Sequence, residues 1–290
     1  MTRHRAGTLA VLAALSLATS AWDHVRPLPF FYDLYTFRGA NGMTDVVAAF
    51  AVPAGRLEPE RLQGRTRYRF DVTLVLTDTA TGAVIRTDDS VYVETRSRLD
   101  GDHLLFTHIQ VATPPSSTTF HRVIMTDATS PGIGQLYGDA FRIRDYSGDD
   151  LMLSDIALGH PETRSGGWRR GSVELALLPT GQFPDSEFDV YYEIYNLPAG
   201  HRYQTEVGVQ HVDTRGIPQG DPATVRFQGV APRGAFVQEL RRIDTALPRG
   251  KHRLTVVVTD LISGATASRS RTFTVRGTTR QATMVPALPR

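Results

Sequence analysis

A regular alternation of apolar and polar side chains is the feature that most constrains how this chain folds. In the stretch RYRFDVTLVLTD, residues 67 to 78, the side chains at every second position are apolar and share one face, while the polar ones share the other. Similar stretches occur in SVYVET, RVIMTD, SVELALL, RYQTEVGVQHV and RLTVVVTD, between clusters of Gly, Pro, Asp and Ser. We therefore expect an all-β chain with two-layered sandwiches. The best helix candidate, GAFVQELRRID, is short.

Four segments of the chain occur twice in the same order. DVVAAFAVPAGR (45 to 56) matches DVYYEIYNLPAGH (189 to 201), and RYRFDVTLVLTDTATG (67 to 82) matches RYQTEVGVQHVDTRG (202 to 216). VATPPSSTTFHRVIMTDATSPG (111 to 132) then matches DTALPRGKHRLTVVVTDLISG (244 to 264), and each copy closes on a Phe-containing strand ending at 143 or 275. This order predicts two tandem immunoglobulin- or fibronectin-like β-sandwich modules, residues 28–147 and 148–277. Residues 278–290 lack alternation and are expected to form a loose tail.

The first 21 residues have the three parts of a secretory signal. Arg3 and Arg5 precede an apolar stretch from Leu9 to Ala18, and small residues follow at 19 to 21. The stretch is short for a membrane span, so we expect cleavage and export to the periplasm or the medium, with an uncleaved anchor as the alternative. No second apolar stretch reaches spanning length.

Composition excludes several classes of function. Removal of Arg3 and Arg5 from the 32 basic residues leaves 30, which balance the 30 acidic ones, so no basic field predicts nucleic-acid binding. The chain has no cysteine, which excludes thiolate metal sites and a thiol nucleophile, and an exported protein without disulfides suits a bacterial envelope.

Several of these segments resemble a known family. LMLSDIAL at 151 to 158, the YYEIYNL stretch, and a Pro-containing turn followed by a VVVTD strand, SG and a last Phe-containing strand look like the β-sandwich repeats of bacterial GWxTD domain-containing proteins. The Gly-Trp-x-Thr-Asp signature is absent, and GGWRRGS at 166 to 172 does not match it. The resemblance implies an architecture and no particular activity.

The stretch EFDVYYEIY carries the main candidate binding residues. Tyr191, Glu193 and Tyr195 share one face of the expected strand, where two rings and a carboxylate could contact a protein or stack on a sugar. In the first copy the matching positions are Val47, Ala49 and Ala51, an apolar face that also needs cover. The alternative is therefore that the tyrosines pack against a loop or the sister module.

A weaker candidate is a calcium site in the linker RDYSGDDLMLSD. Asp145, Ser147 and Asp149 alternate there and offer oxygen ligands, but the distal bidentate Glu of a calcium loop is missing, and an ordinary solvated turn is the alternative. We expect no other cofactor.

Catalytic motifs are missing from the sequence. It contains no His-Glu-x-x-His, Gly-x-Ser-x-Gly, phosphate-binding loop or dinucleotide fingerprint, and His121 and His252 occupy matching places in the two copies, which indicates a structural role. We expect a non-enzymatic scaffold, adhesion or protein-interaction module of the cell envelope with an envelope protein as its partner. The alternative is a carbohydrate-binding module that uses the tyrosine face.

Overall fold

The computed structural model describes residues 26–130, 132–161, 167–179, 187–234, 236–244 and 247–275. Within these ranges the chain is all-β, as predicted, apart from one 3₁₀ turn, η1 (Ala54–Arg56). No helix among the described residues has the length and apolar character needed to cross a membrane. The predicted signal segment, 1–21, and the predicted tail, 278–290, lie outside the described residues.

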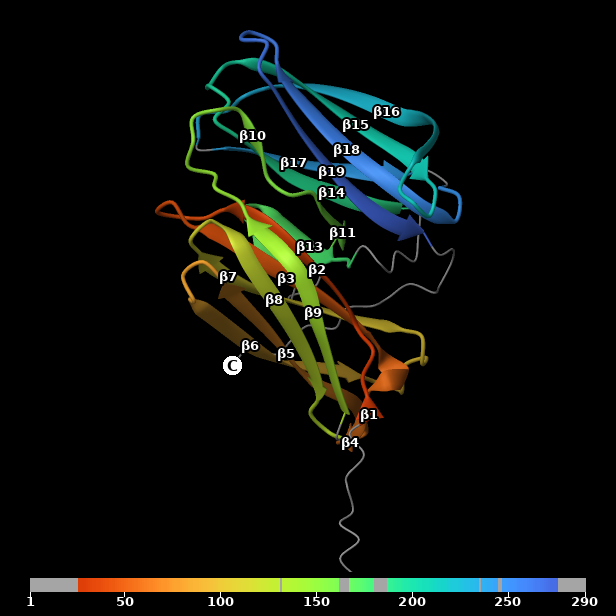
Figure 1. Ribbon diagram of the computed structural model, residues 1–290. Helices are drawn as coiled ribbons and strands as arrows, with labels where there is room; N and C mark the ends of the chain where they lie inside the picture. The colour runs from red at the N-terminus through yellow and green to blue at the C-terminus, as the bar shows by residue number, and fades with distance from the viewer. Residues whose placement is uncertain are drawn as a thin grey trace, which may run out of the picture.

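Four sheets make up the described part of the fold, two from each half of the chain (Figure 1). Sheet A has the order β1-β9-β8-β5-β4 with β6 beside β5, and its strands are β1 (Arg26–Pro27), β4 (Glu60–Leu62), β5 (Arg65–Asp78), β6 (Val84–Thr95), β8 (Ser116–Asp127) and β9 (Gly132–Ile143). Sheet B has the order β2-β3-β7, with β2 (Phe31–Arg38), β3 (Thr44–Pro53) and β7 (Leu104–Thr113).

The second half of the chain builds sheets C and D. Sheet C has the order β10-β14-β11-β13-β12 with β17 beside β14, and its strands are β10 (Met152–Leu153), β11 (Ala157–Pro161), β12 (Trp168–Arg170), β13 (Val173–Leu177), β14 (Glu187–Tyr195) and β17 (Phe236–Asp244). Sheet D has the order β16-β15-β18-β19, with β15 (Arg202–Val212), β16 (Pro218–Val230), β18 (Gly250–Asp260) and β19 (Thr266–Val275).

The two halves repeat the same strand order. The run β9-β8-β5-β6 of sheet A corresponds to β19-β18-β15-β16 of sheet D, and β2-β3-β7 of sheet B corresponds to β11-β14-β17 of sheet C. The segments that match in the sequence fall on equivalent strands: β3 with β14, β5 with β15, β8 with β18 and β9 with β19. Sheet C has three further strands, β10, β12 and β13, without a counterpart in sheet B.

Three hydrophobic clusters bind the sheets into a stack of four layers. One cluster fills the space between sheets A and B, where Tyr68, Phe70, Val72, Leu74 and Leu76 of β5 are buried, as their alternation predicts. A second cluster lies mainly between sheets C and D. The third joins sheet B to sheet C. Sheets B and C are thus inner layers, and β3 and β14 are buried on both faces.

The candidate helix GAFVQELRRID does not form. Its described residues, Phe236–Asp244, are strand β17, which pairs with β14 along the whole of Glu187–Tyr195. A short helix would satisfy the hydrogen-bonding groups of its own backbone only. Pairing as a strand also satisfies the backbone N–H and C=O groups along one edge of the buried strand β14, so tertiary context overrides local helix propensity.

Candidate functional site

The layer between sheets B and C, which we call the junction, contains the predicted tyrosine site. Aromatic rings from both halves meet here: Phe37 of β2 stacks on Trp168 of β12 with ring centroids 5.0 Å apart, and Trp168 meets Tyr191 of β14 edge-on at 5.3 Å. The buried side chains of the cluster are Tyr35, Phe37, Val47, Ala49, Ala157, Trp168, Val173, Leu175, Leu177 and Tyr191.

The prediction that Tyr191, Glu193 and Tyr195 form an exposed binding face is wrong. All three residues are 0% exposed, because sheet B covers this face of β14. The two phenol groups donate hydrogen bonds of 2.6 Å to the two carboxylate oxygens of Glu193. The alternative interpretation, packing against the sister module, is the arrangement found, and it leaves these rings unable to stack on a sugar or contact a partner.

Arg170 of β12 completes this buried group. Its Nε and Nη2 donate to Glu193 at 2.7 and 3.0 Å, its Nη1 donates to Asp45 of β3 at 2.6 Å, and its Nη2 also donates to the carbonyl of Arg38 at 2.6 Å. Burial by itself lowers the pKa of Arg170, but the hydrogen bonds to Glu193 and Asp45 and the charge of Glu193 outweigh burial and raise it. One guanidinium therefore bridges carboxylates from both halves of the chain.

The tyrosines of this group act as neutral hydrogen-bond donors. Burial raises the pKa of Tyr195 and of Tyr191 well above their ordinary values, and the neighbouring charge of Glu193 raises both further. The Tyr195 oxygen also accepts a hydrogen bond from the backbone N–H of Arg38 at 2.9 Å, and the Tyr191 oxygen accepts one from Gln238 at 2.8 Å. With its donors and acceptors satisfied inside the protein, the group is suited to holding the halves together rather than to proton transfer.

A second polar group lies beside the first. Asp155, just before β11, accepts hydrogen bonds from the backbone N–H and the hydroxyl of Thr36 in β2, at 2.8 and 2.7 Å. The Tyr146 hydroxyl donates to the Thr36 carbonyl at 3.1 Å, and burial together with the charge of Asp155 raises the pKa of Tyr146 to about 12. From β19, Arg271 pairs with Asp33, and its guanidinium lies 4.1 Å from the ring centre of Tyr35.

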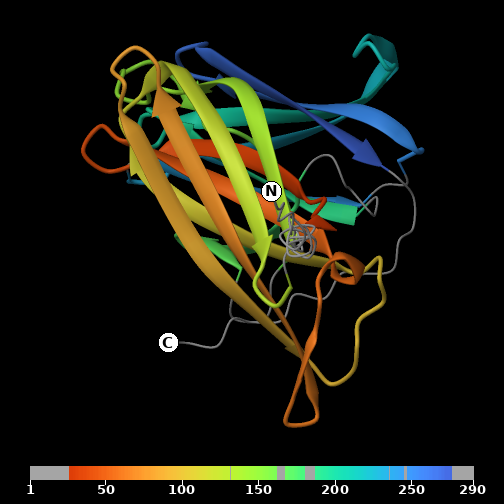
Figure 2. The same cartoon turned by 60° about the horizontal axis from the view of Figure 1, so that its bottom comes forward.

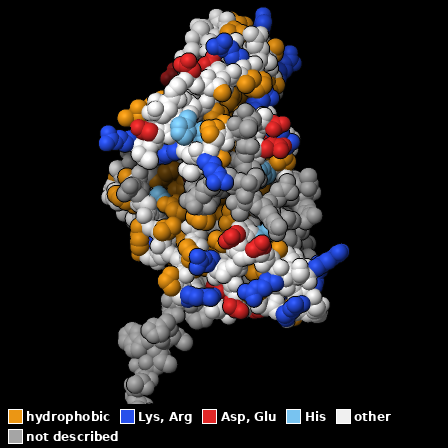
Figure 3. Space-filling model, turned by 90° about the vertical axis from the view of Figure 1, so that its right-hand side faces the viewer, with side chains coloured by type: hydrophobic (Ala, Val, Ile, Leu, Met, Phe, Trp, Pro, Cys, Tyr) orange, Lys and Arg blue, Asp and Glu red, His pale blue; other side chains and the backbone are white. Residues whose placement is uncertain are grey.

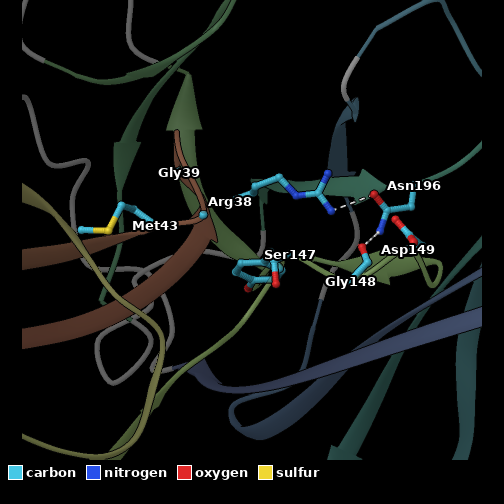
Figure 4. A pocket seen from close by; sticks show the side chains of 9 residues that line it. Arg38, Gly39, Met43, Ser147, Gly148, Asp149 and Asn196 are labelled. Carbon is cyan, nitrogen blue, oxygen red and sulfur yellow. Dashed lines mark hydrogen bonds between the residues drawn. The ribbon is translucent and has the colours of Figure 1, made fainter.

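A pocket of about 320 Å³ opens beside the junction, lined by the β2–β3 turn, the linker and the end of β14 (Figure 4). Asn196 connects these parts: its side-chain nitrogen donates to the carbonyls of Gly148 and Asp150 at 2.6 and 2.7 Å, and its oxygen accepts from Arg38 at 2.8 Å. The Arg38 guanidinium lies 4.4 Å from the centre of the Tyr195 ring. The pocket wall is therefore fixed by contacts between the halves.

The candidate calcium ligands Asp145, Ser147 and Asp149 take part in other contacts in the described structure. Asp145 accepts the backbone N–H of Ser147 at 2.8 Å, and hydrogen bonds from the Ser147 side chain and backbone lower its pKa. Asp149 lines the pocket instead, and no group of three potential His, Asp or Glu ligands is found among the described residues. The Asp145 turn is the ordinary one that Asx side chains make.

The Asp residues of the two matching Thr-Asp pairs have equivalent roles that sequence reasoning missed. Asp260, at the end of β18, accepts from the Ile262 N–H at 2.9 Å through Oδ1 and from the Ser263 hydroxyl at 2.6 Å through Oδ2, which also lies 2.8 Å from His201 Nδ1. Asp127, at the end of β8, accepts from the N–H groups of Thr129 and Glu58 at 3.0 and 2.8 Å. Each carboxylate fixes its hairpin turn to a neighbouring loop.

Each of the matched histidines contacts a phenylalanine, although the ring geometry differs. His121 meets Phe141 edge-on at 5.9 Å, and His252 stacks on Phe273 at 5.5 Å. Both phenylalanines belong to the last strand of their half.

Comparisons with known proteins add little to this picture. No protein-family model and no curated protein matches the sequence. Among solved structures, the chain is similar to red sea bream transglutaminase, with 10% identity and a TM-score of 0.24, over 84% of this chain and 31% of that one. It is also similar to Bacteroides uniformis β-glucuronidase, with 8% identity and a TM-score of 0.28, over 79% of this chain and 26% of that one. The chain thus spans under a third of each structure, and both TM-scores are too low to carry an argument.

Proposed function

We propose that this chain is a non-enzymatic scaffold or interaction module of the bacterial cell envelope, built from two immunoglobulin- or fibronectin-like sandwiches, residues 28–147 and 148–277. The repeated sheet order supports two equivalent modules. The junction supports a fixed arrangement of them, since buried ion pairs and stacked rings leave little freedom for one half to swing. Export is supported by the signal-like N-terminal sequence.

The observation that carries the proposal is the outer face of sheet A, which exposes large aromatic side chains. Tyr137 of β9 is 71% exposed and Phe120 of β8 is 45% exposed. Arg122, the cross-strand partner of Tyr137, places its guanidinium 5.9 Å from that ring. Alternation along β8 puts Phe120 and Arg122 on the same face. Aromatic residues beside arginine are the composition enriched in protein–protein contacts, so this face, rather than the tyrosines of β14, is the surface we assign to a protein partner.

A crosslinked capture from the native cell envelope tests this assignment. The wild-type chain is expected to capture one dominant envelope protein, and the Phe120→Ala/Tyr137→Ala variant is expected to lose it, because both are large, exposed aromatic side chains of this face. The matched control is Ile217→Ala/Val230→Ala, which removes two similarly exposed side chains from β16 and its preceding turn. Equal capture by the wild type and both variants would mean that the outer face of sheet A does not bind the partner. Loss of capture in the control variant alone would place the contact on sheet D.

A further inference from the structure

Arginine side chains gather at the end of the molecule where β1 and β4 lie. The β4–β5 hairpin carries Arg61 and Arg65, and β5 and β6 pair next to it at Thr66 and Thr95, which brings Arg96 and Arg98 alongside. Figure 2 shows the β4–β5 turn projecting beside the connection from β6 to β7, and Figure 3 shows several Lys and Arg side chains at the lower end of the molecule, with Asp and Glu side chains among them. We call this the arginine end. The balanced charge of the whole sequence conceals it.

Several of these arginines have no carboxylate partner. Exposed Arg56, Arg61, Arg96 and Arg98 form no ion pair in the described structure, whereas Arg67 pairs with Glu94, and Arg69 and Arg26 pair with Glu60 and Asp127. Glu60, Glu94 and Asp127 are thus engaged by the inner arginines. The four outer arginines face solvent without an ion pair, while exposed Asp100 and Asp102 follow Arg98 in the β6–β7 connection. Such a cluster attracts an extended negative surface.

An exposed apolar side chain lies next to Arg61 and Arg65. Leu62, the last residue of β4, is 41% exposed, and it immediately precedes the turn formed by Gln63 and Gly64, whose φ angles are 49° and 79°. It stands opposite Arg65 across the hairpin. An aliphatic tip surrounded by arginines is the pattern of segments that lie at a lipid interface, with the apolar group among the acyl chains and the guanidinium groups among the headgroups. Nucleic acid offers no apolar phase for such a side chain.

The chain also enters its fold at this end. Arg26, the first described residue, begins β1 and forms an ion pair with Asp127, which in turn binds the backbone of Glu58 (Figure 1). The preceding sequence contains the apolar stretch from Leu9 to Ala18. In the precursor, before the expected cleavage, only a few residues separate this apolar stretch from Arg26.

We propose that the arginine end binds the surface of a bilayer that contains anionic phospholipid, with Leu62 inserted at the interface and Arg61, Arg96 and Arg98 in contact with the headgroup phosphates. The opposite layer, sheet D, then faces away from the membrane. Binding weakens as salt is added, because the contacts between arginine and headgroup are exposed and screened.

Co-sedimentation with lipid vesicles tests the proposal. The chain is purified as its cells produce it, its N-terminus is read by mass spectrometry, and every variant is compared with a wild type that has the same N-terminus. Binding is expected to vesicles of phosphatidylcholine with phosphatidylglycerol and not to phosphatidylcholine alone. Arg61→Glu/Arg96→Glu/Arg98→Glu is expected to bind about 100-fold more weakly, since each basic side chain near an anionic surface strengthens binding several-fold. Leu62→Ser is expected to bind about tenfold more weakly at unchanged charge.

The control removes the same charge from the other module. Arg215→Glu/Arg233→Glu/Arg249→Glu changes three exposed arginines outside sheets A and B, and it is expected to bind as the wild type does. Equal weakening by the two triple variants, or equal binding to neutral and anionic vesicles, would overturn the proposal. Binding to heparin or DNA without binding to vesicles would overturn it as well. Far-UV circular dichroism and thermal melting establish whether each variant is folded. If the triple variant does not fold, Leu62→Ser still tests the proposal, because it alters a single exposed side chain.

Discussion

At the scale of single residues, Glu193 is the group on which the junction depends most. It is a fully buried carboxylate whose oxygens accept from Tyr191, Tyr195 and Arg170. Glu193→Gln replaces one acceptor oxygen by an amide that cannot accept, and it leaves the buried guanidinium with Asp45 alone. We expect a loss of about 3–5 kcal/mol in the free energy of unfolding, measured by urea denaturation.

The control for Glu193 is Glu174, a glutamate that pairs with the other arginine of β12, Arg169. Glu174 binds Arg169 at 2.7 Å, but the arginine side chain is 68% exposed. Glu174→Gln is expected to cost less than about 1 kcal/mol, because an exposed ion pair contributes little. Similar losses for the two variants would mean that burial of the Glu193 group is not what stabilises the junction.

Asp260 predicts a dependence of stability on pH. Burial opposes its ionisation, but hydrogen bonds from Ser263, His201 and Ile262 outweigh burial and hold its pKa below the ordinary value. A carboxyl group with a lower pKa in the folded state stabilises the fold above its unfolded pKa of about 3.9, and this contribution is lost as the pH falls below that value. We expect Asp260→Asn to be less stable than wild type at neutral pH, with the difference shrinking in acid, as followed by thermal melting from pH 7 down to pH 3.

Asp221 serves as the comparison for Asp260. It is exposed in β16 and has no ion pair in the described structure. Asp221→Asn should leave the melting temperature unchanged across the same pH range. A difference between Asp260→Asn and wild type that stays constant with pH would show that the turn, and not the charge, supplies the stability.

At the scale of elements, alternation predicted where the strands lie in the sequence, but it did not predict which other elements cover their faces. Which side chains of β5 point into the core follows directly from its sequence. One face of this strand packs against a core and the other does not, and such a strand shows an alternating pattern within its own residues. The cover over β14 does not, because it depends on tertiary contacts with β2, which lies far from it in sequence and contributes Phe37, and with the short strand β12, which contributes Arg170. The role of the stretch GGWRRGS could not be predicted for the same reason. Trp168 and Arg170 acquire their roles through tertiary contacts with β14 and with the first half of the chain.

The β12–β13 hairpin is the element that seals the junction, and Trp168 is its anchor. The indole is 1% exposed, packs on Phe37 and Tyr191, and donates a hydrogen bond to Gln110 of β7 at 3.3 Å. Trp168→Ala leaves a large cavity, and we expect a loss of about 3–5 kcal/mol in urea denaturation. Tyr137→Ala, which removes a ring that is 71% exposed, should change stability by less than about 0.5 kcal/mol. A small effect of Trp168→Ala would mean that the hairpin is dispensable for docking the modules.

At the scale of the whole molecule, the duplication predicted two modules, but the sequence alone did not show that they share a core. Matching Val47 with Tyr191 in the two copies suggested that both faces needed cover, and the structure satisfies this need by placing the faces against each other. The charge-balanced composition likewise concealed an uneven distribution, because Arg96 and Arg98 reach the hairpin of Arg61 only through the pairing of β5 with β6.

A shared core makes the two modules unfold together. The third hydrophobic cluster and the Arg170 ion pairs would be lost if either half unfolded, so a chain with one unfolded half exposes much of the junction and is poorly populated. In a Trp22→Phe background the tryptophan fluorescence, excited selectively, comes from Trp168 alone, since the chain has two tryptophans. We expect the urea transition of this fluorescence, which reports on the junction, to coincide with that of far-UV circular dichroism, which reports on all four sheets.

Arg170→Ala in the same background should move the fluorescence transition to a lower urea concentration than the circular dichroism transition. This substitution leaves Asp45 and Glu193 unpaired, but it spares the cores between sheets A and B and between sheets C and D. If the Trp22→Phe chain with Arg170 intact shows two separate transitions, the modules unfold independently. The fixed arrangement proposed for the scaffold would then be wrong.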